Sequence, residues 1–264
     1  MKKIIYFTIC ILFFACNETI EASGPTYQAI LASYEVEDIL ENIQQKVNDA
    51  FTRAIIEKSP VALQNLDSAL QNVEEGQAKK LANYWRAYLH FYITIYHLQE
   101  KDKKEAEYYC DAAIEILEDM DDKNVEDYAL LAMIRGISIS FKAGIRAPFI
   151  SGKAEKEVKK AMALDENNLR AWYVIANNDY YKPEQYGGGK KVESHLLKAI
   201  ELPDQKVPNN YLPSWGKSEA YELLIKFYIK KERWKDAKAK FAEANKAYPN
   251  NFQINKLASK LIDK

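Results

Sequence analysis

Apolar and polar positions recur with a helical period along most of this chain. An early stripe predicts a long first helix, with apolar members at Val36, Ile39, Leu40, Ile43, Val47, Ala50, Phe51 and Ala54. A second helix is expected from Pro60 to about Val73. Further antiparallel pairs are predicted at 77–99 with 103–118, 124–143 with 153–163, 169–181 with 189–201, and 217–231 with 233–246. A last stripe, Ile254, Leu257, Ala258 and Leu261, predicts a helix that caps the final pair.

The second helix of each predicted pair carries a packing signature. A small or β-branched residue is followed four positions later by a larger one, and three positions after that by alanine, as in Ala62/Leu66/Ala69, Ala106/Cys110/Ala113, Ala154/Val158/Ala161, Val192/Leu196/Ala199 and Ala237/Phe241/Ala244. Such repetition at helical spacing predicts a stacked array of helix pairs. The fold class is therefore expected to be all-α, an α-solenoid of about five antiparallel pairs with a C-terminal capping helix.

The fifth pair resembles a tetratricopeptide repeat (TPR). Seven of the eight signature positions of that family are matched, and Ile225 replaces the usual small residue at the eighth; the matches are Tyr221, Leu224, Tyr228, Ala237, Phe241, Ala244 and Pro249. The fourth pair matches with Trp172, Ile175, Ala176, Leu196 and Ala199. The first two pairs match weakly. The resemblance implies a TPR-like solenoid over residues 27–264.

The repeats are longer than the family norm. The five signatures start at 62, 106, 154, 192 and 237, further apart than the ~34 residues of a standard repeat. We expect the extra residues in longer first helices and in two loops, Gly144–Lys153 and Lys182–Lys191. Insertions in solenoids map to loops that often lie on a binding face.

The resemblance also implies a ligand face. In the TPR family the first helix of each pair lines the inner surface. The corresponding positions of the fourth pair are Arg170, Tyr173, Asn177, Tyr180 and Tyr181. Tyrosine offers a large rigid ring together with a hydroxyl, so these five residues are the predicted partner-binding set.

The N-terminus is typical of an exported protein. Lys2 and Lys3 precede an uncharged, mostly apolar run from Ile4 to Cys16, which is shorter than the ~18 residues of a membrane span and fits a signal peptide. Ala15–Cys16 resembles the end of a bacterial lipobox, although Phe13 and Phe14 depart from its usual residues. The expectation is a signal peptide at 1–15, a lipid on Cys16 and a polar tether at 16–26. Ordinary cleavage and an uncleaved anchor stay open.

Composition excludes several classes of function. Acidic and basic residues nearly cancel, 38 against 37, so no overall field recruits nucleic acid. The glycine run 187–189 before two lysines suggests an anion loop, but it lacks the Walker spacing, and a tight turn is the better interpretation. His90 and His97 lie seven apart, outside the spacing of helical metal sites. Cys110 occupies a packing position, which favours a buried thiol over a nucleophile.

These patterns favour a noncatalytic scaffold. No metal or cofactor is expected, and no enzyme motif is present. Residues 180–191 and 213–216 resemble TPR lipoproteins and periplasmic TPR proteins of Gram-negative bacteria, which implies a lipid-anchored protein of the outer membrane or periplasm. The expected function is binding of a protein or peptide partner in the cell envelope. The alternative is a lipoprotein that binds a small ligand or glycan for an uptake system.

Overall fold

The computed structural model describes residues 38–74, 76–142, 146–204, 209–262 and 264, and these contain helices and no strand. The expected signal peptide, Cys16 and the tether lie outside the described residues. The helices are α2 (Ile43–Glu57), α3 (Val61–Gln71), α4 (Gly76–Gln99), α5 (Lys103–Glu118), α6 (Val125–Ser138), α7 (Arg146–Leu164), α8 (Leu169–Tyr181), α9 (Val192–Glu201), α10 (Lys217–Lys230), α11 (Trp234–Ala247) and α12 (Phe252–Lys256), with 3-10 turns η1 (Asp38–Leu40), η2 (Glu184–Tyr186) and η3 (Ala258–Lys260).

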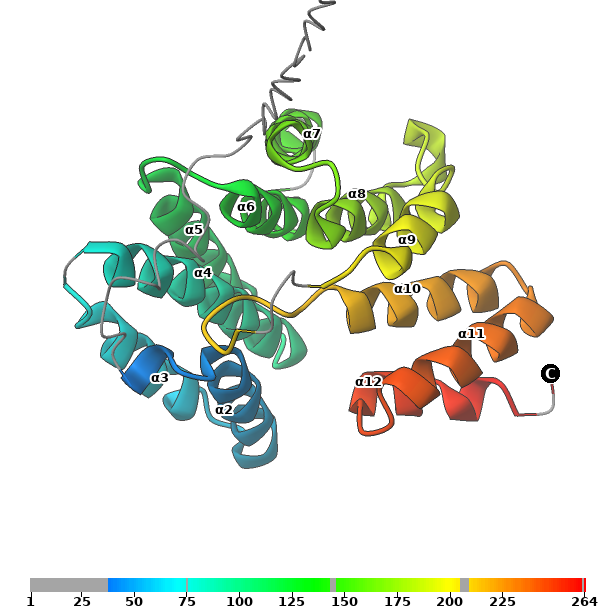
Figure 1. The fold of residues 1–264 in the computed structure, drawn as a ribbon, viewed down its shortest axis with the longest axis horizontal. Helices are drawn as coiled ribbons and strands as arrows, with labels where there is room; N and C mark the ends of the chain where they lie inside the picture. The colour runs from blue at the N-terminus through cyan, green and yellow to red at the C-terminus, as the bar shows by residue number, and fades with distance from the viewer. Residues whose placement is uncertain (1–37, 75, 143–145, 205–208, 263) are drawn as a thin grey trace, which may run out of the picture.

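The five predicted pairs are confirmed. The helices pack as α2 with α3, α4 with α5, α6 with α7, α8 with α9 and α10 with α11. The first helices of neighbouring pairs also contact one another, as α2 does with α4, α6 with α8, and α8 with α10. Figure 1 shows the pairs following one another from the blue α2 to the orange α11. The fold is therefore an all-α solenoid of the TPR-like kind.

Several boundaries differ from the sequence prediction. The helix predicted at 124–143 ends at Ser138, and the helix predicted to begin at 189 begins at Val192. The first helix is interrupted, because Asn42 takes a left-handed conformation (φ 53°) between η1 and α2; asparagine tolerates that region better than most residues. The predicted loop Gly144–Lys153 is helical from Arg146 onward, as part of the long α7. The insertion there lengthens a second helix and does not form a binding loop.

The core divides into two parts that meet at α8. The first part of the core contains the buried side chains of the early helices. Its last two members along the sequence are Val174 and Trp215. The second runs from Ala176 to the C-terminus. Trp215 is far in sequence from the other members of the first core, so the connection between α9 and α10 returns to the earlier helices.

The predicted cap is confirmed but short. Ile254, Leu257 and Leu261 are buried in the second core; Ile254 lies in α12, and the two leucines flank the η3 turn. Asn251 begins α12 by accepting the backbone N–H of Ile254 at 3.1 Å. The end of the solenoid is thereby covered.

Candidate functional site

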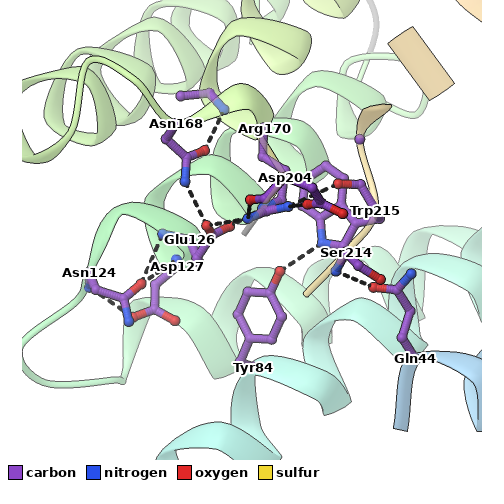
Figure 2. Close-up of polar contacts among 12 residues, drawn as sticks. Gln44, Tyr84, Asn124, Glu126, Asp127, Asn168, Arg170, Asp204, Ser214 and Trp215 are labelled. Carbon is purple, nitrogen blue, oxygen red and sulfur yellow. Dashed lines mark hydrogen bonds and ion pairs between the residues drawn. The ribbon is translucent and has the colours of Figure 1, made fainter. Parts of the chain in front are cut away.

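A buried ionic cluster joins α6, α8 and the connection from α9 to α10. Arg170 is 3% exposed. Its guanidinium donates to Glu126 (Nη2–Oε1 2.8 Å), to Asp204 (Nη1–Oδ1 2.7 Å) and to the carbonyl oxygen of Trp215 (3.1 Å), as Figure 2 shows. Burial opposes the charge of Arg170, but the two carboxylates outweigh burial and raise its pKa. The guanidinium therefore stays charged and holds three segments together.

Helix caps place the partners of Arg170. Asn124 begins α6, where its Oδ1 accepts the backbone N–H of Asp127 at 3.2 Å, and Asp127 accepts the N–H of Asn124 at 2.8 Å. Asn168 begins α8 by accepting the N–H of Ala171 at 3.0 Å, and it donates its Nδ2 to Glu126 Oε1 at 2.6 Å. The capping residues at the start of α6 and α8 therefore position both members of the ion pair, Glu126 and Arg170.

The described part of the α9–α10 connection, residues 209–216, packs on the early helices. The Trp215 indole N–H donates to the Tyr84 hydroxyl on α4 at 2.8 Å. The backbone N–H of Ser214 donates to Gln44 Oε1 on α2 at 2.7 Å. Figure 2 shows both contacts beside the ionic cluster. This connection therefore links the last two pairs to the first two.

Tyrosines and carboxylates from three first helices meet on what we call the inner surface, defined by Tyr88 and Tyr92 of α4, Tyr173 of α8, and Glu219 and Glu222 of α10. The Tyr88 and Tyr92 hydroxyls lie 3.2 Å apart. Burial is the main reason that the pKa values of Tyr92 and Tyr173 are raised, and both glutamates raise them further. The charges of the two α10 carboxylates therefore act on phenols of α4 and α8, although these helices are far apart in sequence.

Trp215 lies beneath the inner surface. Its ring stacks on Tyr88 with centroids 5.9 Å apart and meets Tyr173 edge-on at 6.2 Å. The Trp215 side chain is only 2% exposed. The aromatic rings of α4 and α8 thus rest on a residue supplied by the α9–α10 connection.

The predicted partner-binding residues separate into two groups. Arg170 does not lie on an accessible surface: it is buried and bound to carboxylates, so we assign it a structural role. Tyr173, Asn177 and Tyr180 are partly buried, and Tyr181 is 67% exposed. They follow one stripe of α8, because residues four and seven or eight apart share a helix face. This stripe continues the inner surface outward from Tyr173.

The glycine loop between α8 and α9 is a tight turn. The backbone N–H groups of Gly189 and Lys191 donate to the Asp179 carboxylate at 3.1 and 2.8 Å. A carboxylate of the chain itself therefore occupies the donors that an anion would use. A Cβ on Gly188 would lie 1.9 Å from the carbonyl oxygen of Lys182, so this position requires glycine.

Other candidate groups are structural. Cys110 is buried, and burial raises the pKa of its thiol to about 12, which keeps it protonated and unreactive. His90 and His97 are packed around the ring of Tyr109. Within the described ranges, no group of histidine, cysteine and carboxylate side chains could hold a metal ion.

A hollow of about 400 Å³ opens among α5, α6 and α7. Its charged walls neutralise each other, because Lys142 pairs with Asp111 and Arg135 pairs with Glu118. The lining therefore favours no single ligand charge.

Sequence reasoning missed the contributions of α4 and of the α9–α10 connection to this site. A usable signal was present: Tyr84, Tyr88, Tyr92 and Tyr96 follow one another at intervals of four, which places them on one helix face. Residues 213–216 stood out in the sequence, but no local pattern indicated which side chains Trp215 contacts, since these lie on α4 and α8, 131 residues away at Tyr84 and 45 residues away at Arg170.

Comparisons with known proteins identify the architecture. No family model and no curated protein matches this chain. Two solved structures are similar. TTC0263, a thermophilic TPR protein of Thermus thermophilus, has a TM-score of 0.53 and 16% identity over 83% of this chain and 98% of its own. The HusA haemophore of Porphyromonas gingivalis has a TM-score of 0.54 and 21% identity over 71% of this chain and 93% of its own.

These likenesses concern the fold. One of the two similar proteins is described as a TPR protein and the other as a haemophore. The helix pairs and the likeness to TTC0263 together show that this chain has a TPR-like helical-repeat fold.

Proposed function

We propose that this protein is a noncatalytic scaffold that binds a protein or peptide partner through its inner surface and the adjoining α8 stripe. The observation that supports this most is that Tyr88 of α4 and Tyr173 of α8 both pack on the ring of Trp215, so that tyrosines of two separate first helices meet. Solenoid folds bring such residues together to form extended binding faces. Tyrosine rings give large contact area at low cost in side-chain entropy.

The α8 stripe supplies the accessible part of the proposed contact surface. Tyr181 is among the most exposed large side chains of the described chain, and its ring meets Tyr180 edge-on at 5.0 Å. Lys230 of α10 lies over the Tyr180 ring at 5.2 Å. An exposed tyrosine that packs on a partly buried one fits a surface on which a partner is anchored.

Affinity capture tests the proposal. Wild-type protein and the variants Tyr181→Ala and Tyr108→Ala would be used as bait on solubilised membranes from cells that make the protein. Tyr108 lies on α5 and is 64% exposed, against 67% for Tyr181, so the two variants remove rings of nearly equal exposure. The proposal predicts one partner that Tyr108→Ala retains and Tyr181→Ala loses. Equal capture by both variants, or no partner for wild type, would contradict it.

The proposed location is the cell envelope, with the helical domain tethered through a lipid on Cys16. This rests on the uncharged run that ends at Cys16, and on the polar residues that follow it. None of the described helices has the length and apolar composition needed to cross a bilayer. Mass spectrometry of the mature N-terminus tests the tether: diacylated Cys16 is expected, and any other start contradicts it.

A second candidate function is carriage of a small ligand in an uptake system. The likeness to a haemophore favours it, and tyrosine is one of the side chains that ligate haem iron. Titration of the purified protein with haemin, followed by the Soret band, distinguishes the two. A saturable shift that Tyr181→Ala abolishes supports the carrier. An unchanged spectrum eliminates haem as the ligand.

A further inference from the structure

We propose that the hollow among α5, α6 and α7 binds a small zwitterion, a free α-amino acid with an apolar side chain. The carboxylate of this ligand would bind at Arg135 on α6, and its ammonium group at Glu115 on α5. None of the residues that line the hollow belongs to the inner surface or to the α8 stripe. The site is therefore separate from the proposed contact surface for a protein partner.

Arg135 is a buried cation with unused hydrogen-bond donors. It is 6% exposed and lines the hollow. Among the described residues its side chain has one acceptor, Glu118 at the end of α5, and its Nε has none. Arg170, which is 3% exposed, donates instead from all three of its side-chain nitrogens. Because buried donors are nearly always hydrogen-bonded, Arg135 lacks acceptors that a ligand carboxylate would provide.

Glu118 does not prevent this role of Arg135. The Glu118 side chain is 47% exposed, so it can turn into water when a ligand carboxylate takes its place on the guanidinium. A carboxylate suits that place, because a planar guanidinium can bind both carboxylate oxygens at once. The exchange leaves no buried acid without a partner. Arg135 therefore offers an anchor for the acidic end of a ligand.

The other charges that line the hollow leave one cation and one acid without an ion pair. Lys142 pairs with Asp111. In the described part of the chain, Lys153 of α7 and Glu115 of α5 line the hollow and make no such pair. Glu115 precedes Glu118 by three residues, so the two share a face of α5 with their Cβ atoms about 5–6 Å apart. A ligand that carries both charges would find a partner for each.

Apolar side chains complete the hollow. Phe149 and Ile150 come from the insertion that lengthens α7, and Ile114 comes from α5. Phe149 is 65% exposed, and the Lys153 ammonium lies 5.0 Å from the centre of its ring. The volume of about 400 Å³ is that of a small-ligand site. An apolar side chain of the ligand would cover part of the ring and gain hydrophobic free energy.

Equilibrium dialysis with radiolabelled L-leucine tests the site on the purified protein. Two unlabelled competitors are matched to leucine: leucinamide lacks the carboxylate, and 4-methylpentanoate lacks the ammonium group. We expect saturable binding of leucine. Each competitor should bind at least about tenfold more weakly than unlabelled leucine, because each loses one charged contact.

Two pairs of variants locate the binding. Arg135→Gln removes the anchor, and its control Arg53→Gln removes an exposed arginine of α2. Phe149→Ala removes an exposed ring, and its control Tyr108→Ala removes a ring of nearly equal exposure that does not line the hollow. Arg135→Gln should weaken leucine binding at least about tenfold, and Phe149→Ala at least about threefold. Both controls should keep wild-type affinity, and thermal unfolding checks that every variant is folded.

Three results would overturn the inference. The first is the absence of saturable leucine binding. The second is competition by leucinamide or 4-methylpentanoate that equals competition by leucine, because one of the two charges would then play no part. The third is wild-type affinity in Phe149→Ala or in folded Arg135→Gln; if Arg135→Gln does not fold, Phe149→Ala, which changes an exposed side chain, decides. Partner capture through Tyr181 involves other residues, so its failure would leave this site untouched.

Discussion

Replacement of Arg170 by alanine tests whether this residue holds the fold or contacts a partner. The substitution removes the guanidinium that joins α6, α8 and the α9–α10 connection. It leaves Glu126, 8% exposed, with the Asn168 amide as its remaining contact in the cluster, and it frees the carbonyl oxygen of Trp215. A buried carboxylate would then lack its compensating charge.

The expected loss is large. Removing one partner of a buried ion pair typically costs about 3–5 kcal/mol of unfolding free energy, which is a large part of the ~5–15 kcal/mol that stabilises a domain. Urea denaturation followed by circular dichroism at 222 nm measures it. The control is Arg53→Ala, since Arg53 is 66% exposed and pairs only with Glu57 on the same helix. That loss should stay below about 0.5 kcal/mol.

A double variant strengthens the test. Adding Glu126→Gln to Arg170→Ala removes the uncompensated charge. The double variant should therefore lose less unfolding free energy than the sum of the losses of the two single variants. A loss below about 1 kcal/mol for Arg170→Ala would refute the structural role of Arg170. The structural role would also be refuted if the losses of unfolding free energy of the two single variants simply added in the double variant.

Two further predictions concern single residues. Gly188→Ala should destabilise the α8–α9 turn strongly, because its Cβ would meet a carbonyl oxygen at 1.9 Å, whereas Gly152→Ala in α7 meets nothing within 4 Å and should stabilise the helix by about 0.5–1 kcal/mol; thermal unfolding compares them. Cys110, whose buried thiol has its pKa raised to about 12, should resist iodoacetamide at pH 8 in the native protein and react readily in urea, and rapid native alkylation would contradict its burial.

The helices could be predicted because their signal is local. The alanines of the packing signature, such as Ala106, Ala113 and Ala237, are fully buried, as their spacing indicated. The interruption at Asn42 was missed, because a left-handed residue leaves the apolar stripe on either side intact. The start of α7 was missed, because Gly152 and the apolar Phe149 and Ile150 give no clear helical period.

The site was less predictable because its contacts are long-range. Arg170 occupies a position that faces the ligand in the TPR family, and the motif placed it there. In this chain Asp204 and Trp215, from an insertion that the family pattern does not describe, cover its guanidinium. Trp215 also packs against Tyr173, whereas Tyr181, further along the same stripe of α8, is 67% exposed.

The most direct test of the account is a photo-crosslink made inside the cell. A benzophenone amino acid would replace Tyr181 on the inner stripe or Tyr108 on α5, two positions of nearly equal exposure. The account predicts that position 181 forms a crosslink to one protein partner on irradiation and that position 108 does not. Crosslinks of equal yield at both positions, or at position 108 alone, would contradict it.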